Sequence, residues 1–323
     1  EKPQVGGLAR TVHHKGFRFD IGPHRWFTKN EELNEFMRSL LGGKLLRVPR
    51  LTRIYFNNRF FDYPLKPANA LFGMGLIMAA KIVADYAAVR IAPPRGPVDS
   101  FEDWTIRQFG RTMYNLYFKS YTEKVWGIDC KKISKEWSAQ RIKGLSLLEV
   151  IKNSILKFFK LKNEIRTLIT EFYYPIYGPG MMWNAIGDYI TKNGGEILFN
   201  REVKKIIPRN GKYYLLVYNN QTRKFEKYAA DYVVSSMPLN EFIKSLEAPK
   251  DKKIKNIITN KLRFRSFIAV SLIVKKENIF PDQWIYIHSP EVRVGRIQNV
   301  KNWSKFMVPE GVTLLVAEYF CSE

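Results

Sequence analysis

The sequence predicts an α/β protein in which a nucleotide-binding domain is interrupted by a second domain. Three consecutive blocks predict this fold: a glycine-rich opening, a mainly helical stretch over about 67–169, and a stretch rich in short strands after residue 196. A helical block between glycine-rich and strand-rich blocks indicates an inserted domain. The chain has 323 residues, 46% of them hydrophobic, which is enough for two domains with a sizeable core.

The individual elements are predicted from hydrophobic periodicity and from residues that begin or end elements. Residues 53–63 alternate in hydrophobicity and turn at Asn57 and Asn58, which predicts a β-hairpin. Ser100 and Asp103 resemble a capping box and predict the start of a helix. The other predicted helices span 31–41, 181–192 and 240–260, and the other predicted strands span 17–21, 196–199, 203–207, 213–218, 225–230, 232–236, 266–274, 284–288 and 313–320.

The formal net charge of +23 narrows the class of partner. Lysine and arginine are spread along the whole chain, and no helix-turn-helix, zinc module or RNP-like strand is recognisable, so we expect no nucleic-acid partner. An anionic membrane surface or a phosphorylated substrate fits the charge better. No segment reaches the roughly 20 apolar residues of a membrane span. Residues 144–162 form a basic amphipathic pattern that suits either a helix on a bilayer or an ordinary helix facing the core.

The cysteines and histidines predict neither a disulfide framework nor a metal site. Cys130 and Cys321 lie far apart in the sequence, which fits the reducing cytosol. The histidines have no paired spacing of the kind that binds metal; they are His13, His14, His24 and His288. We therefore expect a cytoplasmic protein, with peripheral contact to the inner face of the membrane as an alternative.

The first chemical motif consists of Glu1 and the segment 5–11, which contains Gly6, Gly7, Arg10 and Thr11. In a dinucleotide fold, an acidic residue at the end of the second strand binds the ribose hydroxyls. Nearby glycines let the backbone approach a pyrophosphate, and arginine and threonine add donors. Two adjacent glycines are also typical of any tight turn, so this motif alone leaves both interpretations open.

The segment 16–24, Gly-Phe-Arg-Phe-Asp-Ile-Gly-Pro-His, resembles the amine oxidase, protoporphyrinogen oxidase and UDP-galactopyranose mutase group of flavoproteins. The resemblance implies FAD as the cofactor. It implies that Glu1 binds the ribose and that Gly6, Gly7, Arg10 and Thr11 lie at the pyrophosphate. It also implies that the flavin ring lies near Gly22, Pro23 and His24, where His24 is either catalytic or only a structural hydrogen-bonder.

The same resemblance implies a Rossmann-like FAD-binding domain with an inserted α+β substrate domain. In the group a glycine-rich fingerprint precedes the acidic residue, so we expect that strand-turn-helix upstream of Glu1 and a domain truncated at both ends. Val203 matches a strand whose backbone meets the adenine, and Gly180 lies in the turn that ends the insertion. The predicted boundaries are 1–50 with 190–240 for the FAD-binding domain, and 51–189 with 241–323 for the substrate domain.

The segment 120–127 resembles the mutase in particular. The resemblance places Tyr121 against a uracil base and Trp126 beside a sugar, and stacking on an aromatic ring suits a base. Arg141 matches, with one extra residue of spacing, an arginine that clamps the substrate phosphates. His24, Trp126 and Arg141 are thus the predicted catalytic residues. Without the resemblance, Tyr121 and Trp126 are core aromatics at a helix end.

A further cluster of aromatic residues and donors spans 284–288 and 293–299. It falls where the substrate domain of such flavoproteins faces the ring. Arg293 and Arg296 are candidate contacts for an anion of the substrate, and are otherwise surface arginines. Glu318 and Tyr319 are further candidates for facing the substrate.

Three functions compete. The favoured one is an FAD-dependent oxidoreductase that takes a hydride from a small-molecule substrate, because Phe27 stands where the mutase pattern has a second histidine. The alternative is a mutase-like enzyme acting on a UDP-sugar without net redox change. A second alternative is a non-catalytic basic protein that binds membrane or nucleic acid on the same fold. The sequence does not determine the oligomeric state.

Overall fold

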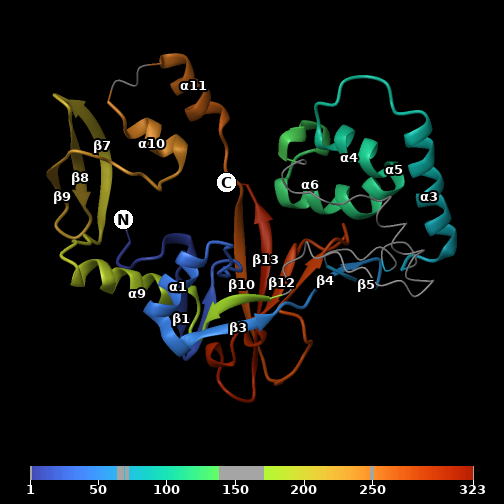
Figure 1. The fold of residues 1–323 in the computed structure, drawn as a ribbon, viewed down its shortest axis with the longest axis horizontal. Coiled ribbons are helices and arrows are strands. Elements are labelled where there is room, and N and C mark those ends of the chain that lie inside the picture. The colour runs from blue at the N-terminus through green and yellow to red at the C-terminus, as the bar shows by residue number, and fades with distance from the viewer. Residues whose placement is uncertain (1, 64–68, 70–72, 138–170, 248–250, 323) are drawn as a thin grey trace. The chain divides into compact units, whose positions relative to one another are not determined.

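A computed structural model describes residues 2–63, 69, 73–137, 171–247 and 251–322 (Figure 1). The chain divides into two compact units. The small unit comprises Glu1–Arg10 and Gly180–Phe264, and the large unit comprises Thr11–Pro179 and Arg265–Glu323. The predicted domain boundaries differ from these bounds. The predicted domains were defined by the ligand that each binds, whereas the two units are defined by packing alone, so the domain boundaries stay a prediction. The same holds for the predicted incomplete Rossmann-like domain, although the fold is mixed α/β as expected.

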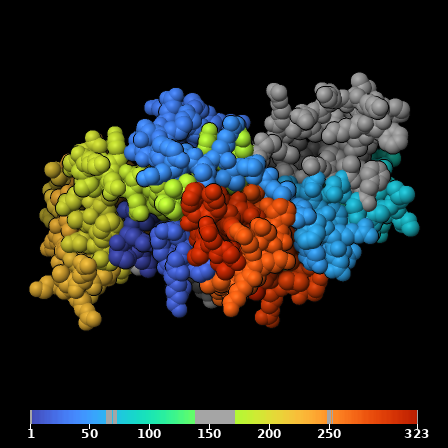
Figure 2. All heavy atoms as spheres, turned by 90° about the horizontal axis from the view of Figure 1, so that it is seen from below, coloured from blue at the N-terminus to red at the C-terminus, as the bar shows by residue number. Residues whose placement is uncertain are grey.

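A six-stranded sheet forms the centre of the large unit, in the order β10-β13-β12-β11-β4-β5. Neighbouring strands are antiparallel except β11 and β4, which are parallel. The strands are β4 (Thr52–Phe56), β5 (Arg59–Asp62), β10 (Ser266–Val274), β11 (Trp284–Ile287), β12 (Arg296–Asn299) and β13 (Thr313–Cys321). In Figure 2, orange and red C-terminal residues accordingly lie beside light-blue residues from the first fifth of the chain.

The hairpin β4–β5 confirms the predicted turn. Asn57 and Asn58 both adopt left-handed backbone conformations, with φ of 50° and 57°. Asparagine tolerates this region better than other non-glycine residues, which is why the sequence signal was readable. Two smaller sheets complete the strands of the large unit: β1 (Thr11–His14) with β2 (Phe17–Asp20), and β3 (Leu45–Pro49) with β6 (Glu171–Pro175).

Side-chain caps begin two helices of the large unit, and one of these caps was predicted. Helix α1 (Glu31–Leu41) begins at Asn30, whose side chain accepts from the Leu33 amide. Helix α4 (Phe101–Phe109) begins with the predicted capping box of Ser100 and Asp103. The remaining elements are α3 (Leu76–Ile91), α5 (Arg111–Met113), η3 (Tyr114–Lys119), α6 (Ser120–Trp126), and the short 3-10 turns η2 (Gly42–Lys44), η4 (Cys130–Lys132), η5 (Val300–Asn302) and η6 (Lys305–Met307). Element η3 is a π-helical segment that leads into α6.

Two apolar clusters hold the central sheet in place. One packs the β4–β5 hairpin against α3 and η3, and includes Ile54, Phe61 and Ile82. The other packs β11 and β13 against β3 and β6, and includes Trp284 and Trp303. Burying such side chains contributes roughly 1.5–3 kcal/mol each. The sheet therefore has a well-packed framework on which polar side chains can be held.

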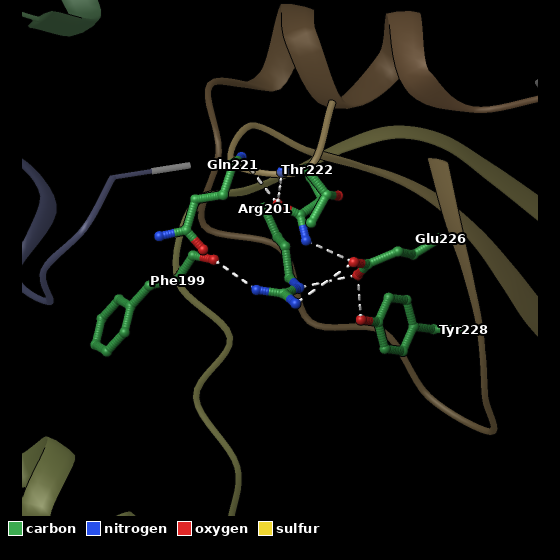
Figure 3. A network of polar contacts seen from close by, with 7 residues as sticks. Phe199, Arg201, Gln221, Thr222, Glu226 and Tyr228 are labelled. Carbon is green, nitrogen blue, oxygen red and sulfur yellow. Dashed lines mark hydrogen bonds and ion pairs between the residues drawn. The ribbon is translucent and has the colours of Figure 1, made fainter. Parts of the chain in front are cut away.

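The small unit combines a three-stranded antiparallel sheet, β7-β8-β9, with helices. Its elements are η1 (Gly7–Ala9), α9 (Pro179–Lys192, which starts at the last residue of the large unit), β7 (Arg201–Arg209), β8 (Lys212–Asn219), β9 (Lys224–Ala230), α10 (Leu239–Ser245) and α11 (Lys252–Lys261). Figure 3 shows the Arg201 guanidinium directed at the Glu226 carboxylate, which also accepts from Tyr228. These contacts, together with Asn219, hold the edge of the sheet and lower the pKa of Glu226 to about 2, with the Tyr228 hydrogen bond the largest cause.

Three predictions in the small unit were wrong. Residues 196–199 are not a strand, and the backbone that follows them bonds elsewhere: the Asn200 amide donates to the Lys2 carbonyl. Residues 232–236 are not a strand either, and Tyr232 and Val234 are 88% and 98% exposed. A strand needs a neighbouring backbone to complete its ladder, and the described residues supply none at either segment. The single helix predicted over 240–260 is the pair α10 and α11.

No helix among the described residues is long and apolar enough to cross a membrane. The basic amphipathic segment 144–162 and Arg141 lie outside the described residues, and so does Glu1.

Candidate functional site

The predicted pyrophosphate loop of the small unit needs its glycines. Gly6 and Gly7 have φ of 98° and 54°, a region that favours glycine. A Cβ on Gly6 would come 2.9 Å from Cδ1 of Trp183, whereas a Cβ on Gly7 would meet nothing within 4 Å. The Arg10 guanidinium donates to the Gly7 carbonyl at 2.8 Å and closes the loop. The loop is therefore a tight turn with one open side.

An orphaned donor lies beside this loop. Trp183 Nε1 is buried and has no hydrogen-bond partner among the described residues. Buried polar groups are almost always paired in folded proteins. Positive-φ backbone and a free indole N–H suit an acceptor-rich group such as a phosphate. The residues present therefore fit the dinucleotide that the sequence predicts at this loop.

The other predicted cofactor residues of the small unit lie in regular elements. Val203 is in β7 and pairs with Val217 of β8. Gly180 lies in the first turn of α9. Val203 lies in a strand as the sequence predicted, whereas Gly180 was predicted in the turn before a helix and lies inside that helix, which begins two residues earlier than predicted. Their roles at the cofactor stay predictions.

In the large unit, Gly22, Pro23 and His24 follow directly after β2. Gly22 has φ of 82°, and a Cβ there would lie 3.3 Å from Cζ of Phe267 on β10. Nε2 of His24 lies 3.0 Å from the Ile21 carbonyl oxygen, so this nitrogen carries the proton and donates. This hydrogen bond fixes the orientation of the His24 ring, which agrees with a structural role. A catalytic role would have to use the other ring nitrogen, Nδ1.

Thr11, which was predicted to lie at the pyrophosphate, belongs to a buried polar network in the large unit. Its hydroxyl donates to Asp20 Oδ1 at 3.1 Å, and the Tyr174 hydroxyl donates to Asp20 Oδ2 at 2.5 Å. Burial raises the pKa of Asp20 to about 7, against the opposing effect of these two hydrogen bonds. Gly178 closes over the network, since a Cβ there would lie 2.4 Å from Thr11 Oγ1. The network ties β1, β2 and β6 together.

An aromatic cluster of half-buried tyrosines and the buried His288 lies in the large unit. Tyr121 of α6 stacks on His288 with ring centroids 4.4 Å apart and an interplanar angle of 9°. It also meets the edge of Tyr286 at 5.5 Å. Tyr286 in turn contacts Tyr63 at 4.8 Å. Tyr286 of β11 and His288, which directly follows this strand, share one face by alternation, and both contact Tyr121 of α6.

Lys124 fixes this cluster to the loop that follows β11. Its ammonium donates to the carbonyl oxygens of Ile287, Ser289 and Val292 at 2.8, 2.9 and 2.7 Å, and to that of Val294 at 3.3 Å. A single side chain of α6 thereby satisfies a whole turn of backbone acceptors. The stack of Tyr121 on His288 is positioned by this anchor.

The cluster is electrically neutral at its centre. Burial, and secondarily the charge of Lys124, lowers the pKa of His288 to about 3, so the imidazole is neutral at physiological pH. Burial also raises the pKa of Tyr121, which stays protonated. Nδ1 of His288 is buried without a partner among the described residues. Tyr121 and His288 therefore bring no charge of their own to the cluster.

Arg296 is neutralised within the sheet. The register places Tyr286, Arg296 and Glu318 side by side on β11, β12 and β13. Arg296 donates through Nε and Nη2 to the buried Glu318 carboxylate, which also accepts from Gln298. The predicted role of Arg296 as an anion contact stays a prediction, and its charge is already compensated by Glu318.

Arg293 and Trp126 lie apart from the Tyr121 stack. Arg293 is exposed and lines an open groove of about 910 Å³ between α6 and the β10–β13 edge, with Lys119, Glu123, Ile268 and Phe320. Trp126 packs edge-on against Trp137 at 5.4 Å, next to a buried cluster that includes Phe101 and Tyr114. Trp126 follows Tyr121 by five positions, which places the two on different sides of the helix. Trp126 packs partly buried against that cluster, its buried Nε1 has no hydrogen-bond partner among the described residues, and its role beside a sugar stays a prediction.

Sequence reasoning included Tyr286 and Gln298 only as members of the cluster 284–299, without a role for either, and it assigned no role to Lys124. The strict alternation over 284–288 was a readable signal for Tyr286 and His288, because alternate residues of a strand share a face. The contacts of Lys124 with backbone carbonyls carried no such signal, because any lysine on a helix has the same local pattern. Glu318 was named only as facing the substrate, and its ion pair depends on strand register.

The chain resembles several solved structures over its whole length. It aligns with reduced UDP-galactopyranose mutase at a TM-score of 0.83 and 20% identity, covering 100% of this chain and 68% of that one. An oxidoreductase from Methanosarcina mazei aligns at 0.64 and 16% identity, covering 99% and 72%. A conjugated-linoleic-acid-producing fatty acid isomerase from P. acnes aligns at 0.59 and 11% identity, covering 100% and 70%. These likenesses establish the fold.

The sequence itself matches the family described as flavin containing amine oxidoreductase over residues 1–322, almost from end to end. The match agrees with the glycine loop at Gly6 and Gly7 and with the segment 16–24, on which the resemblance was first based. The chain belongs to the flavin-containing amine oxidoreductase family.

Proposed function

We propose that the protein is an FAD-dependent oxidoreductase that removes a hydride from a C–H or C–N bond of a small-molecule substrate. The observation that carries this proposal is the neutral aromatic cluster of Tyr121, Tyr286 and buried His288, in which the two tyrosines are partly exposed, in a chain of the flavin-containing family. When bound, the flavin supplies the two-electron chemistry. The protein then has to bind and orient the substrate and keep water away, and the partly exposed tyrosines are proposed to do so.

The residues of this chain have distinct parts in that proposal. The loop of Gly6, Gly7 and Arg10, with the Trp183 N–H, holds the cofactor pyrophosphate. Gly22 and His24 lie near the flavin ring. Tyr121 packs against the uncharged part of the substrate. His288, which stacks on Tyr121, is neutral at neutral pH and adds no positive charge next to the substrate. None of these steps needs a strong acid or base near pH 7.

A second candidate is a mutase-like reaction on a UDP-sugar, in which reduced flavin acts without net redox change. Two observations favour it: the TM-score of 0.83 to reduced UDP-galactopyranose mutase, against 0.64 to the oxidoreductase from Methanosarcina mazei, and Tyr121 in a mutase-like motif. Phe27, at the position of the mutase's second histidine, weighs against it. Phe27 is 47% exposed and brings no proton donor to that position.

Equilibrium binding of UDP to the oxidised and reduced flavin-loaded protein separates the two. For an oxidoreductase, UDP binds no better than other nucleotides and does not respond to reduction. Micromolar UDP affinity that tightens on flavin reduction and is lost in Tyr121→Ala would establish the second candidate. Tyr177→Ala is a matched control, because Tyr177 is an exposed aromatic of the same unit that contacts Phe306.

Small molecules are the proposed partners, and no role in nucleic-acid binding is proposed. The described residues contain no cluster of three or more His, Cys, Asp or Glu able to hold a metal ion.

A further inference from the structure

One face of helix α3 in the large unit is apolar and open to solvent. The opposite face packs on the β4–β5 hairpin through side chains that include the buried Ile82 and Tyr86. On the open face Ile77 is 90% exposed, and Leu76 and Ile91 are 75% and 85% exposed. A surface helix ordinarily turns polar side chains to the solvent, so large apolar side chains at these positions indicate a surface that binds something.

The exposed apolar residues of α3 form one continuous strip along the helix. At 3.6 residues per turn they fall within an arc of about 140°, on the side opposite the buried residues. We call this surface the α3 strip; it consists of Leu76, Ile77, Ala80, Val83, Ala84, Ala87, Ala88 and Ile91. The carboxylate of the helix, Asp85, lies outside the strip and accepts from the Thr112 amide at 2.5 Å.

A cation borders the α3 strip on each side. By the same helical geometry, Lys81 lies beside the edge formed by Ile77, and Arg90 lies beside the edge formed by Val83. Both cations are exposed, and neither has an ion pair among the described residues. Arg90 donates to the Gln108 carbonyl at 3.3 Å, which is a neutral acceptor. The strip is therefore apolar along its middle and positively charged at both margins.

The size and the charge of the α3 strip favour a lipid surface over a second copy of the chain. Helix α3 has 16 residues, so the strip is about 24 Å long and about 10 Å wide, roughly 240 Å². A stable dimer buries about 800 Å² on each partner, several times this area. Apolar side chains between two margins of cations suit a bilayer, because lysine and arginine extend toward anionic headgroups while the apolar side chains enter the lipid.

We propose that the α3 strip docks the protein on the surface of a bilayer that contains anionic phospholipid, with the helix lying in the plane of the headgroups. A membrane span needs roughly 20 apolar residues, and the opposite face of α3 is held in the protein core, so the helix lies on the bilayer and does not cross it. Tyr286 packs against that same core cluster, so docking holds the aromatic cluster of the large unit at a fixed distance from the lipid. The proposal is independent of the reaction proposed above.

The test is co-sedimentation of the purified, flavin-loaded, full-length protein with two kinds of vesicle: phosphatidylcholine alone, and phosphatidylcholine with phosphatidylglycerol in equal parts. We expect binding to the anionic vesicles that weakens as salt is added. Ile77→Ser should weaken it roughly 10-fold through the loss of apolar burial, and Lys81→Gln about 5-fold through the loss of one cation. Leu33→Ser is the matched control, because Leu33 is 44% exposed on α1 of the same unit, outside the strip, and should leave binding unchanged.

A fluorophore on the α3 strip shows whether this surface is the one that meets the lipid. Cys130 is buried, so in a Cys321→Ser background a nitrobenzoxadiazole group is attached only at an introduced cysteine. We expect its emission to shift to shorter wavelength on the anionic vesicles when it is attached at Ile77→Cys. At Leu33→Cys the emission should not change.

The other outcomes contradict the proposal in distinct ways. Absence of binding to anionic vesicles, or equal binding by Ile77→Ser and wild type, overturns docking through the α3 strip. Equal binding to both kinds of vesicle overturns the role of the anionic headgroups. Light scattering that shows a dimer, lost in Ile77→Ser, in protein that binds no vesicles assigns the strip to a second copy of the chain. Circular dichroism checks folding, and Ile91→Ser takes the place of Ile77→Ser should that variant not fold.

Discussion

His288 and Asp20 are buried ionisable residues of the large unit whose pKa values shift in opposite directions. Burial lowers the pKa of His288 from 6.5 to about 3, so its contribution to stability is complete above pH 6.5 and is lost as the pH falls toward 3. Burial raises the pKa of Asp20 from 3.8 to about 7, so its contribution is complete below pH 3.8 and is lost as the pH rises toward 7. Between pH 3.8 and 6.5 the two effects oppose each other.

Removing either ionisable group should therefore reveal the effect of the other on the pH dependence of stability. His288→Phe keeps a ring for Tyr121 to stack on, and Asp20→Asn keeps hydrogen-bonding capacity for Tyr174. Relative to wild type, we expect the free energy of unfolding of His288→Phe to fall with rising pH in this window, and that of Asp20→Asn to rise. The expected slopes approach 1.4 kcal/mol per pH unit, the value for one proton. Urea titrations at several pH values measure them, and parallel curves for all three proteins would refute the assigned pKa shifts.

At the scale of elements, the turn after β6 depends on Gly178. Its φ is 88°, and a Cβ would lie 2.4 Å from Thr11 Oγ1 and 3.1 Å from Asp20 Oδ1, so a methyl group there both strains the backbone and disrupts the buried network. Gly178→Ala should lower the free energy of unfolding by about 2–4 kcal/mol. Gly42→Ala is the matched control: Gly42 has φ of 52° with nothing near its Cβ, and should cost only about 1 kcal/mol. Equal losses in the two variants would show that the contact has no effect.

The connection between β8 and β9 depends on Asn219. Its side-chain oxygen accepts from the amides of Gln221 and Thr222 at 2.9 and 3.1 Å, and its amide donates to Glu226 at 2.6 Å. Asn219 is buried, so Asn219→Ala leaves these groups unsatisfied and should cost about 2–4 kcal/mol. Asn220→Ala, at the exposed neighbouring position, should change stability by less than about 0.5 kcal/mol. Hydrogen exchange at the Gln221 and Thr222 amides reports the local effect, and unchanged protection in Asn219→Ala would contradict it.

The elements of the fold that could be predicted from the sequence are those that depend on local signals. The hairpin turn at Asn57 and Asn58 and the capping box at Ser100 were predicted because both depend on residues within a few positions of each other. Strand β3 and strand β6 were not predicted, since each is short and is stabilised by a partner more than a hundred residues away. Residues 232–236 had the composition of a strand, but composition does not provide a neighbouring backbone.

The site shows the same division. The loop at Gly6 and the segment 16–24 carry local signatures, and the family match agrees with them. Arg296 was predicted as an anion contact from its residue type, but its ion pair with Glu318 is set by the register of β12 and β13. Sequence patterns thus indicated the class of cofactor, whereas the charge balance of the substrate surface depends on the fold.

At the scale of the whole molecule, the central claim is that bound flavin accepts a hydride from the substrate. Anaerobic mixing of the purified, FAD-loaded protein with pools of small molecules that carry an oxidisable C–N or C–H bond tests it most directly, with flavin absorbance as the readout. We predict that at least one pool bleaches the flavin and that air restores the colour. If no pool bleaches the flavin while the chemically reduced protein isomerises a UDP-sugar and remains reduced, the account is contradicted.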